Sequence, residues 1–209
     1  MPTDINLSKE GMIYQREQYQ KGGVGKKYWL YKDNFIINLV KGRENIIDIG
    51  CGEGILLEQL IKKFPKKEIF GIDGEEENVE ICKKHGLNVR LGSVYELPLE
   101  DSSIDCIIFM EVIEHLDRPE QAIREISRVL KKDGIVIILF PNDAMFKFAR
   151  IATLNMKEAF YDTGHVKQWS PSSIKKIVKK FGLSPVAKKN LPFVVWPVSL
   201  HHLIVAKKQ

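Results

Sequence analysis

The stretch that decides the fold of this 209-residue chain is Ile46-Ile47-Asp48-Ile49-Gly50-Cys51-Gly52-Glu53-Gly54, an apolar run that leads into three glycines at alternate positions. After it, apolar residues recur at helical spacing, at Ile55, Leu56, Leu57, Leu60, Ile61 and Phe64. The order is therefore buried strand, glycine turn and amphipathic helix. Glycine lets the backbone press closely against a ligand, and a helix N-terminus offers unpaired N–H groups. The pattern predicts a cofactor site at the turn.

The spacing of the glycines bears on which cofactor binds. A dinucleotide site has the spacing G-x-G-x-x-G, whereas this turn has G-x-G-x-G with Asp48 two residues ahead of it. A carboxylate at Asp48 would repel the phosphates of a dinucleotide and attract the amino group of a cationic ligand. The turn therefore favours a ligand that carries an ammonium group.

Further strands and helices alternate along the chain. The second strand, 68–73, ends in Asp73 about 20 residues after the glycine turn, where a carboxylate can accept both hydroxyls of a ribose. Asp73 can also cap the helix that begins in the acidic run 75–77, and the two roles are compatible. Later strands are predicted at 88–92, 104–110, 135–140, 184–191 and 199–207, and later helices at 118–131 and between Ser170 and Gly182.

Five motifs follow one another in the sequence: DIGCGEG (48–54), GID (71–73), LP (97–98), IDCIIFMEVIEHL (104–116) and VLKKDGIVIILFPN (129–142). In this order and at these spacings they resemble the class I S-adenosylmethionine-dependent methyltransferases, and they are most similar to the branch with the ubiquinone-biosynthesis O-methyltransferases and other small-molecule methyltransferases. The resemblance implies a Rossmann-like α/β fold with a seven-stranded, mostly parallel sheet, a reversed C-terminal hairpin and helices on both faces. It also implies S-adenosyl-L-methionine as cofactor and methyl transfer to a small-molecule acceptor, at oxygen.

The resemblance further implies which residues bind the cofactor: Asp48, Gly50, Cys51, Gly52, Gly54, Asp73, Gly74, Gly92, Ser93, Val94, Met110 and Glu111. Ser93 departs from the family, which often has Asp there to contact the adenine amino group, but a serine hydroxyl can still accept a hydrogen bond. Cys51 has no base adjacent in sequence to activate it, so we interpret it as a small residue beside the ligand and not as a nucleophile.

A group of acids and histidines follows the fourth strand. Glu111, Glu114 and His115 share one face if the turn is helical, and His165 lies later in the chain, just ahead of Trp169. In similar O-methyltransferases, including the small-RNA 2′-O-methyltransferases, an E-x-x-E-H turn and a later histidine bind a divalent ion that polarises the acceptor. The alternative is that these side chains shuttle a proton or are structural. We take His115, His165 and Glu114 as catalytic candidates and assign no metal ligand.

Two adjacent histidines, His201 and His202, lie on the predicted last strand. Because side chains alternate between the faces of a strand, we expect one in the core and the other on the surface. No function is assigned to either.

Composition and charge restrict the remaining possibilities. The length suits one domain with a substantial core, and no run approaches the roughly 20 apolar residues of a membrane span. The N-terminus lacks a signal-peptide pattern, and three cysteines without metal-ligand spacing suit a reducing compartment, so we expect the cytoplasm. The net charge of +5 comes mostly from lysine pairs that alternate with Glu and not with aromatic residues, which does not indicate nucleic-acid binding.

The chain divides into four parts of one predicted domain. Residues 1–44 form a helical cap with a flexible basic hinge at 21–27, and residues 45–142 form the cofactor-binding core. Residues 143–169 are an apolar-rich insertion, which we expect to be a lid over the acceptor and a candidate for peripheral membrane contact. Residues 170–209 form the last helix and the hairpin.

Three other functions compete with this interpretation. A nicotinamide-dependent oxidoreductase would share the first strand-turn-helix unit, but the glycine spacing, Asp48 and the EVIEHL segment argue against it. A non-catalytic methyltransferase-like scaffold would usually have lost the glycines or Asp73. An RNA 2′-O-methyltransferase is favoured only if a metal ion and a basic groove are present.

Overall fold

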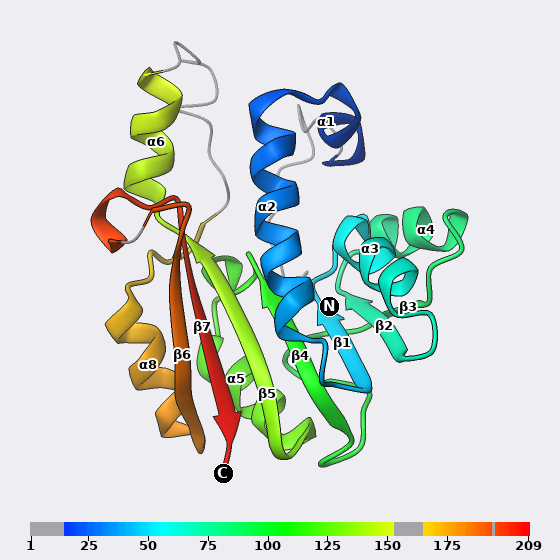
Figure 1. Cartoon of the computed structure of the whole chain (residues 1–209). Coiled ribbons are helices and arrows are strands. Elements are labelled where there is room, and N and C mark those ends of the chain that lie inside the picture. Colours follow the sequence, from blue (N-terminus) through cyan, green and yellow to red (C-terminus); the bar gives the residue numbers. More distant parts are fainter. Residues whose placement is uncertain (1–14, 153–164, 194) are drawn as a thin grey trace.

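The computed structural model describes residues 15–152, 165–193 and 195–209. These residues form one seven-stranded sheet in the order β3-β2-β1-β4-β5-β7-β6 (Figure 1). The strands are β1 Asn45–Ile49, β2 Glu68–Asp73, β3 Val89–Leu91, β4 Ile104–Met110, β5 Leu130–Pro141, β6 Leu183–Leu191 and β7 His201–Lys208. Strand β7 is antiparallel to both β5 and β6, and the pairings among β1 to β5 are parallel. The expected Rossmann-like sheet with its C-terminal hairpin is confirmed.

Helices cover both faces of this sheet (Figure 1). On one face, α2 Gly23–Leu39, α3 Ile55–Lys63 and α4 Glu76–Lys84 share a buried cluster with the strands. On the other, α5 Pro119–Val129 and α8 Pro171–Lys180 share a second cluster. The remaining described helices are α1 Gln15–Lys21, α6 Asp143–Ala152 and the 3-10 turns η1 Ile113–His115 and η2 Trp196–Val198.

The alternation of side chains along the central strands produces these two cores. In β4, Ile107 and Phe109 belong to the cluster with α5 and α8, whereas Cys106 and Ile108 belong to the cluster with α2 and α3. All four side chains are fully buried. A parallel strand covered on both faces is apolar throughout, which explains why IDCIIFM has no polar-apolar alternation.

Three predictions about local structure were wrong. The predicted hinge 21–27 is mostly helix: Gly22, with φ 80° and ψ −145°, separates α1 from α2, and Gly23 already begins α2. The predicted helix 118–131 ends at Val129, because Leu130 pairs with Ile104 of β4 and so begins β5 before the predicted start at 135.

The third error concerns the histidines of the last strand. His201 and His202 are both buried, 3% and 2% exposed, instead of one being on the surface. Strand β7 lies between β5 and β6, and both faces of such an interior strand are covered.

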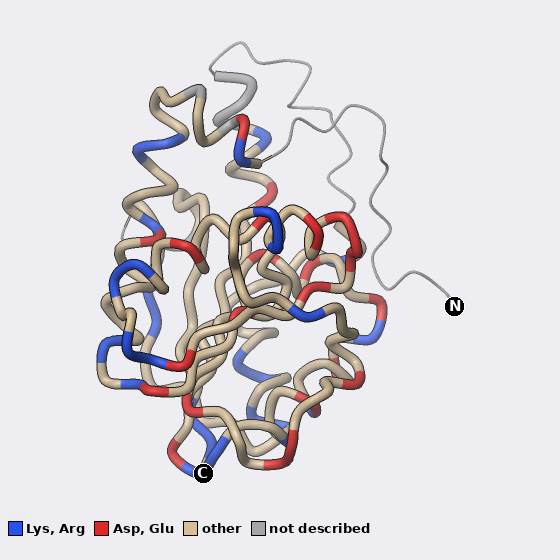
Figure 2. The backbone as a smooth tube through the Cα atoms, turned by 90° about the vertical axis from the view of Figure 1, so that its right-hand side faces the viewer, with Lys and Arg blue, Asp and Glu red and all other residues tan. Residues whose placement is uncertain are grey.

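The insertion 143–169 is described only in part. Its first ten residues form α6, residues 153–164 lie outside the described residues, and the chain from His165 leads into α8. Within the described ranges, no helix is both long and apolar enough to cross a membrane. Figure 2 shows basic and acidic segments interspersed over the side of the molecule that it presents.

Candidate functional site

The glycine turn joins β1 to α3 at the carboxyl edge of the sheet. Gly50, Gly52 and Gly54 have φ values of 70°, 54° and 74°, a region that L-residues with side chains rarely adopt. A Cβ at Gly50 would lie 2.3 Å from Val112, and one at Gly54 would lie 2.5 Å from Leu87, so packing alone excludes side chains there. Among the described residues, the three atoms nearest to a Cβ at Gly52 all belong to the side-chain amide of Gln15, at 3.2 Å or more.

Asp73 connects the turn to the end of β2. Its Oδ2 accepts a hydrogen bond from the Gly52 N–H at 2.7 Å, and its Oδ1 accepts from Glu75 N–H at 3.0 Å and Asn78 Nδ2 at 3.1 Å. The carboxylate, 4% exposed, therefore holds the start of α4 and also orients the turn. It is not the cap that the sequence suggested, because Glu75 is the N-cap residue of α4 and its side chain makes no capping hydrogen bond. Two carboxylate oxygens offer about four acceptor positions, so capacity remains for a ligand hydroxyl.

The residues expected around the adenine lie at the ends of β2 and β3. Gly74 faces Gly92, since a Cβ on Gly74 would lie 3.9 Å from the Gly92 carbonyl oxygen. The Ser93 hydroxyl accepts a hydrogen bond from Tyr95 N–H at 3.1 Å, and Val94 is 8% exposed. The Ser93 oxygen thus shapes its own turn.

Asp48 and Cys51 are held close to buried acids and thiols. Burial, followed by the nearby Asp73 and Asp33, raises the pKa of Asp48 well above its usual range. The hydrogen bond to Cys82 and burial raise the pKa of the Cys51 thiol. A thiol with a raised pKa is a poor nucleophile, in line with the interpretation of Cys51 as inert.

The end of β4 presents Met110 and then Glu111. Met110 packs against the cluster with α2 and α3. Glu111 has a φ of 55°, and its carboxylate contacts Lys32 of α2 and His201 of β7. The sequence pattern grouped Glu111 with Glu114 and His115, but its side chain has these other partners.

Glu114, His115 and His165 do come together. Their ligand-type atoms all lie within 4.8 Å of one another, and the two imidazole rings meet edge to face with centroids 4.8 Å apart. The Glu114 carbonyl accepts from Val166 N–H at 2.9 Å and Lys167 N–H at 3.2 Å, so the chain near His165 runs beside η1. Trp169 Nε1 donates to the Ile113 carbonyl at 3.2 Å and secures this contact.

The comparisons with known proteins agree with this geometry. A family model described as a methyltransferase domain matches residues 47–138. A ubiquinone biosynthesis O-methyltransferase of Pelagibacter ubique is 29% identical over 171 residues, which cover 77% of this chain and 67% of that protein. The crystal structure of a SAM dependent methyltransferase from Archaeoglobus fulgidus has a TM-score of 0.72 at 20% identity and covers 94% of this chain and 100% of that one.

Residues 47–138 thus match a methyltransferase domain, and the chain is similar in sequence and in fold to S-adenosylmethionine-dependent methyltransferases. These similarities favour a methyltransferase over the oxidoreductase alternative. The chain spans less than half the length of some relatives. An uncharacterized methyltransferase of Schizosaccharomyces pombe is 32% identical, and the match covers 49% of this chain and 41% of that protein. An uncharacterized 37.1 kDa protein of Streptomyces fradiae is 38% identical, and the match covers 47% of this chain and 30% of that protein.

The turn and its acids fit S-adenosylmethionine. At Gly52 the backbone is covered by a side-chain amide and not by packed core, so a ligand can approach it. Asp48 is 2% exposed, and burial together with nearby Asp73 and Asp33 raises the pKa of its carboxyl group. The ammonium of S-adenosylmethionine would supply a cation that favours the ionised carboxylate. Asp73 retains acceptor capacity for a ribose hydroxyl.

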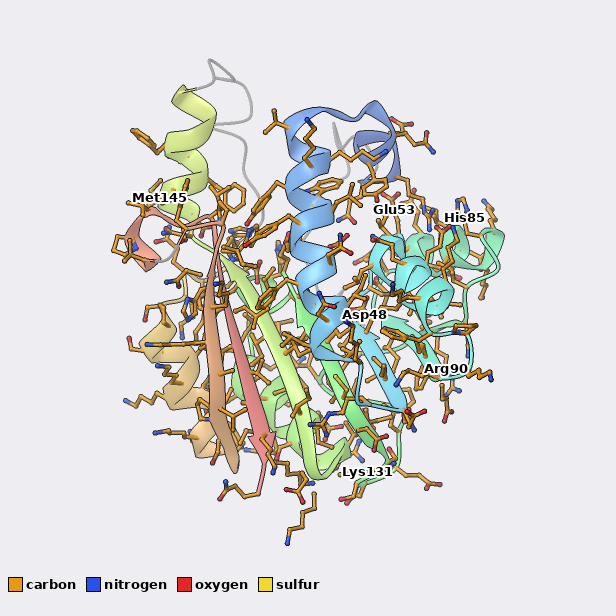
Figure 3. The ribbon with its side chains drawn as sticks, in the orientation of Figure 1. Asp48, Glu53, His85, Arg90, Lys131 and Met145 are labelled. Atoms are coloured by element: carbon orange, nitrogen blue, oxygen red, sulfur yellow. The ribbon has the colours of Figure 1, made fainter. Side chains whose placement is uncertain are left out.

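Sequence reasoning missed several residues at this site. Glu53, in the turn, accepts from Gln15 N–H at 2.6 Å and Arg16 N–H at 2.9 Å, and so holds α1 over the turn. Figure 3 shows Glu53 on one side of α2 and Met145, which belongs to α6, on the other side. Asp143 pairs with His165 at 2.8 Å. Asp143 directly follows the FPN motif, and this position could have indicated that it belongs to the site. No local sequence pattern indicates that α1 contacts Glu53.

Proposed function

We propose that the protein transfers the methyl group of S-adenosylmethionine to a hydroxyl oxygen of a small-molecule acceptor. The bound cofactor supplies an activated methyl group, so the protein has to hold the acceptor in line, exclude water and remove the hydroxyl proton. The observation that carries the proposal is the group formed by Glu114, His115 and His165. Glu114 and His115 lie in η1, which follows β4 at the carboxyl edge where ligands bind in open α/β sheets, and His165 reaches them from the segment ahead of α8.

His165 is the better placed of the two histidines to act as base. His165 Nδ1–H donates a hydrogen bond to Asp143 Oδ1 at 2.8 Å, which leaves Nε2 as the acceptor nitrogen. The His115 ring stands at 75° to that of His165 and restricts its orientation. We therefore assign proton removal to His165 and a supporting position to His115.

A divalent ion is the second candidate for this group, and Glu114 favours it. Among the described residues, neither carboxylate oxygen of Glu114 has a hydrogen-bond partner, although the residue is 2% exposed. Burial raises the pKa of Glu114 well above its usual range, and nearby Glu111 and Asp143 raise it further. A buried carboxylate of this kind needs a proton or a cation, and a cation here would polarise an acceptor hydroxyl.

The test is a methylation screen with methyl-labelled S-adenosylmethionine against phenols, catechols, amines and short RNAs. We expect an O-methylated phenol or catechol. Products from amines or RNA alone would contradict the proposed acceptor, and failure to bind S-adenosylhomocysteine by calorimetry would point to a non-catalytic scaffold. Activity lost in chelator and restored by Mg²⁺ would assign the group to a metal ion.

We also propose that the chain is one domain in which the helical cap (1–44) and the insertion (143–169) cover the acceptor. Peripheral membrane contact through the insertion is supported by Phe148 on α6, which is 63% exposed. Co-sedimentation with phosphatidylglycerol vesicles, compared with Phe148→Ser, tests this contact. Three free thiols suit the cytoplasm.

A further inference from the structure

Glu111 has an unusual backbone conformation for its residue type. Its φ of 55° lies in the left-handed region, which residues with a Cβ rarely occupy. Its N–H donates to the Leu139 carbonyl of β5 at 2.8 Å, so the residue still belongs to the edge of the sheet. Conformations of this kind persist where surrounding contacts impose them, and they are concentrated at functional sites. The contacts of the side chain identify what imposes this one.

Two buried donors converge on one oxygen of Glu111. The Lys32 ammonium pairs with Oε1, and His201 Nε2 lies 3.2 Å from the same atom. Lys32 is 5% exposed and His201 is 3% exposed, so neither can turn to solvent instead. The Glu111 side chain keeps 40% exposure. Among the described residues none donates to Oε2, so one oxygen is fixed and the other remains available.

The neighbours of the His201 ring decide which of its two nitrogens carries the proton. The Tyr28 hydroxyl lies 2.7 Å from His201 Nδ1. Burial raises the pKa of Tyr28 and lowers the pKa of His201, so the phenol keeps its proton and the imidazole is neutral. The Tyr28 hydroxyl also lies 3.3 Å from the Leu191 carbonyl oxygen, so it has two acceptors within reach. The carboxylate of Glu111 can only accept, so the ring proton of His201 lies on Nε2, which donates to Glu111, and Nδ1 accepts from Tyr28.

The charges of this group favour an ionised Glu111. Burial by itself would raise the pKa of Glu111, but the Lys32 ammonium and the hydrogen bond from His201 outweigh it and hold that pKa well below its usual range. Lys32 belongs to α2, Glu111 follows β4 and His201 begins β7. Three segments that are distant in sequence thus fix one carboxylate next to η1.

We propose that Lys32 and His201 are positioning residues that fix Glu111 on the acceptor side of the site, with its free oxygen toward the acceptor, in place of the cofactor contact that the resemblance implied for Glu111. The inference rests on the proposed methyl transfer for its kinetic consequence but not for its geometry. A displaced Glu111 would orient the acceptor poorly while the cofactor contacts at the glycine turn remain intact. Helix α2 then contributes directly to turnover and is more than a cover.

The kinetic test compares Lys32→Met, which removes the charge at similar volume, with Lys32→Arg, which keeps it. Lys27→Met, on the exposed side of α2, is the matched control. With catechol as acceptor, we expect Lys32→Met to lower kcat by about tenfold or more and to change the KM for S-adenosylmethionine by less than about threefold. Lys32→Arg should recover part of the loss, and a wild-type kcat in Lys32→Met would overturn the proposal.

A second measurement needs no acceptor and separates failure of this inference from failure of the proposed function. Nitrogen-15 NMR of the imidazole rings, with His201 assigned by its loss in His201→Gln, reports which ring nitrogen carries the proton. We expect a protonated Nε2 in the wild-type protein. A proton on Nδ1 alone would overturn the inference even if the enzyme methylates catechol. A protonated Nε2 in a protein that methylates no hydroxyl compound would support the geometry and reject the proposed function.

Discussion

The three glycines of the turn have different surroundings, and this difference separates folding from binding. Gly50 and Gly54 lack room for a Cβ because Val112, Leu87 and Cys82 pack against them. Substitution there would damage the core. At Gly52 the nearest atoms in the described part of the chain belong to the flexible Gln15 side chain, so we expect a side chain at this position to intrude mainly on a ligand.

We expect Gly52→Val to lower the affinity for S-adenosylhomocysteine by about tenfold or more, because the branched side chain would occupy the space of the ligand. The positive φ also costs stability, of the order of 1–3 kcal/mol. Gly182→Val is the matched control, since Gly182 has φ 77° with no atom within 4 Å of its Cβ position. Calorimetry of both folded variants checks the prediction, and equal affinities would contradict it.

Asp73 has both structural and binding roles in this account. Asp73→Ala removes three hydrogen bonds within the protein as well as the proposed bonds to the ribose. Hydrogen bonds to charged groups contribute about 1.5–3 kcal/mol each, so both the free energy of unfolding and the affinity for S-adenosylhomocysteine should fall. Asn78→Ala, which loses one of the protein contacts, is the control for stability. Unchanged binding in Asp73→Ala would refute the ribose assignment.

The raised pKa of Asp48 predicts a pH dependence of cofactor binding. Below that pKa the carboxyl is protonated in the free protein, whereas the ligand ammonium favours the ionised form, so binding releases a proton. The affinity for S-adenosylhomocysteine should therefore rise with pH until the pKa of the free protein is passed. Calorimetry across pH in Asp48→Asn should lose this slope, and an identical slope in the variant would exclude Asp48 as its cause.

Helix α6 and the chain around His165 are held mainly by contacts with the turn η1 and with each other. The segment 165–169 is held by backbone bonds to the Glu114 carbonyl and by the Trp169 bond to Ile113. Through Asp143, helix α6 is connected to the same place. The position of the insertion is therefore coupled to η1 and not to the sheet alone.

This attachment predicts that the described part of the insertion responds to the cofactor. We expect amide hydrogen exchange in α6 to slow when S-adenosylhomocysteine is bound, while exchange in α8, which packs in the buried cluster with α5, stays the same. Strong and equal protection of α6 in both states would identify a fixed element and reject the expected lid.

For the molecule as a whole, the candidate chemistry depends on segments that meet only after folding. His115 follows β4, His165 precedes α8 and Asp143 begins α6. The other described histidines do not belong to this group. His85 is exposed at the end of α4, and His201 and His202 are buried on β7.

Replacement of His165 by Ala should lower kcat by about 10²-fold or more, the usual range for a lost general base, and His115→Ala should have a smaller effect. The affinity for S-adenosylhomocysteine should stay within about threefold, because neither ring is expected to touch the nucleoside. His85→Ala is the control. If both site variants methylate at the wild-type rate, the histidines are structural and catalysis rests on proximity.

Local sequence determined the order of strands and helices, the glycine turn and the acids at the ends of β1 and β2, because each depends on a short-range periodicity or on backbone freedom at one residue. The sequence also indicated Glu114, His115 and His165, through spacing and resemblance. Tertiary structure alone decided that Lys32 and His201 hold Glu111, that Glu53 binds the start of α1 and that both histidines of β7 are buried. Those contacts join residues far apart in the chain, and strand order and helix packing, which no local pattern encodes, bring them together.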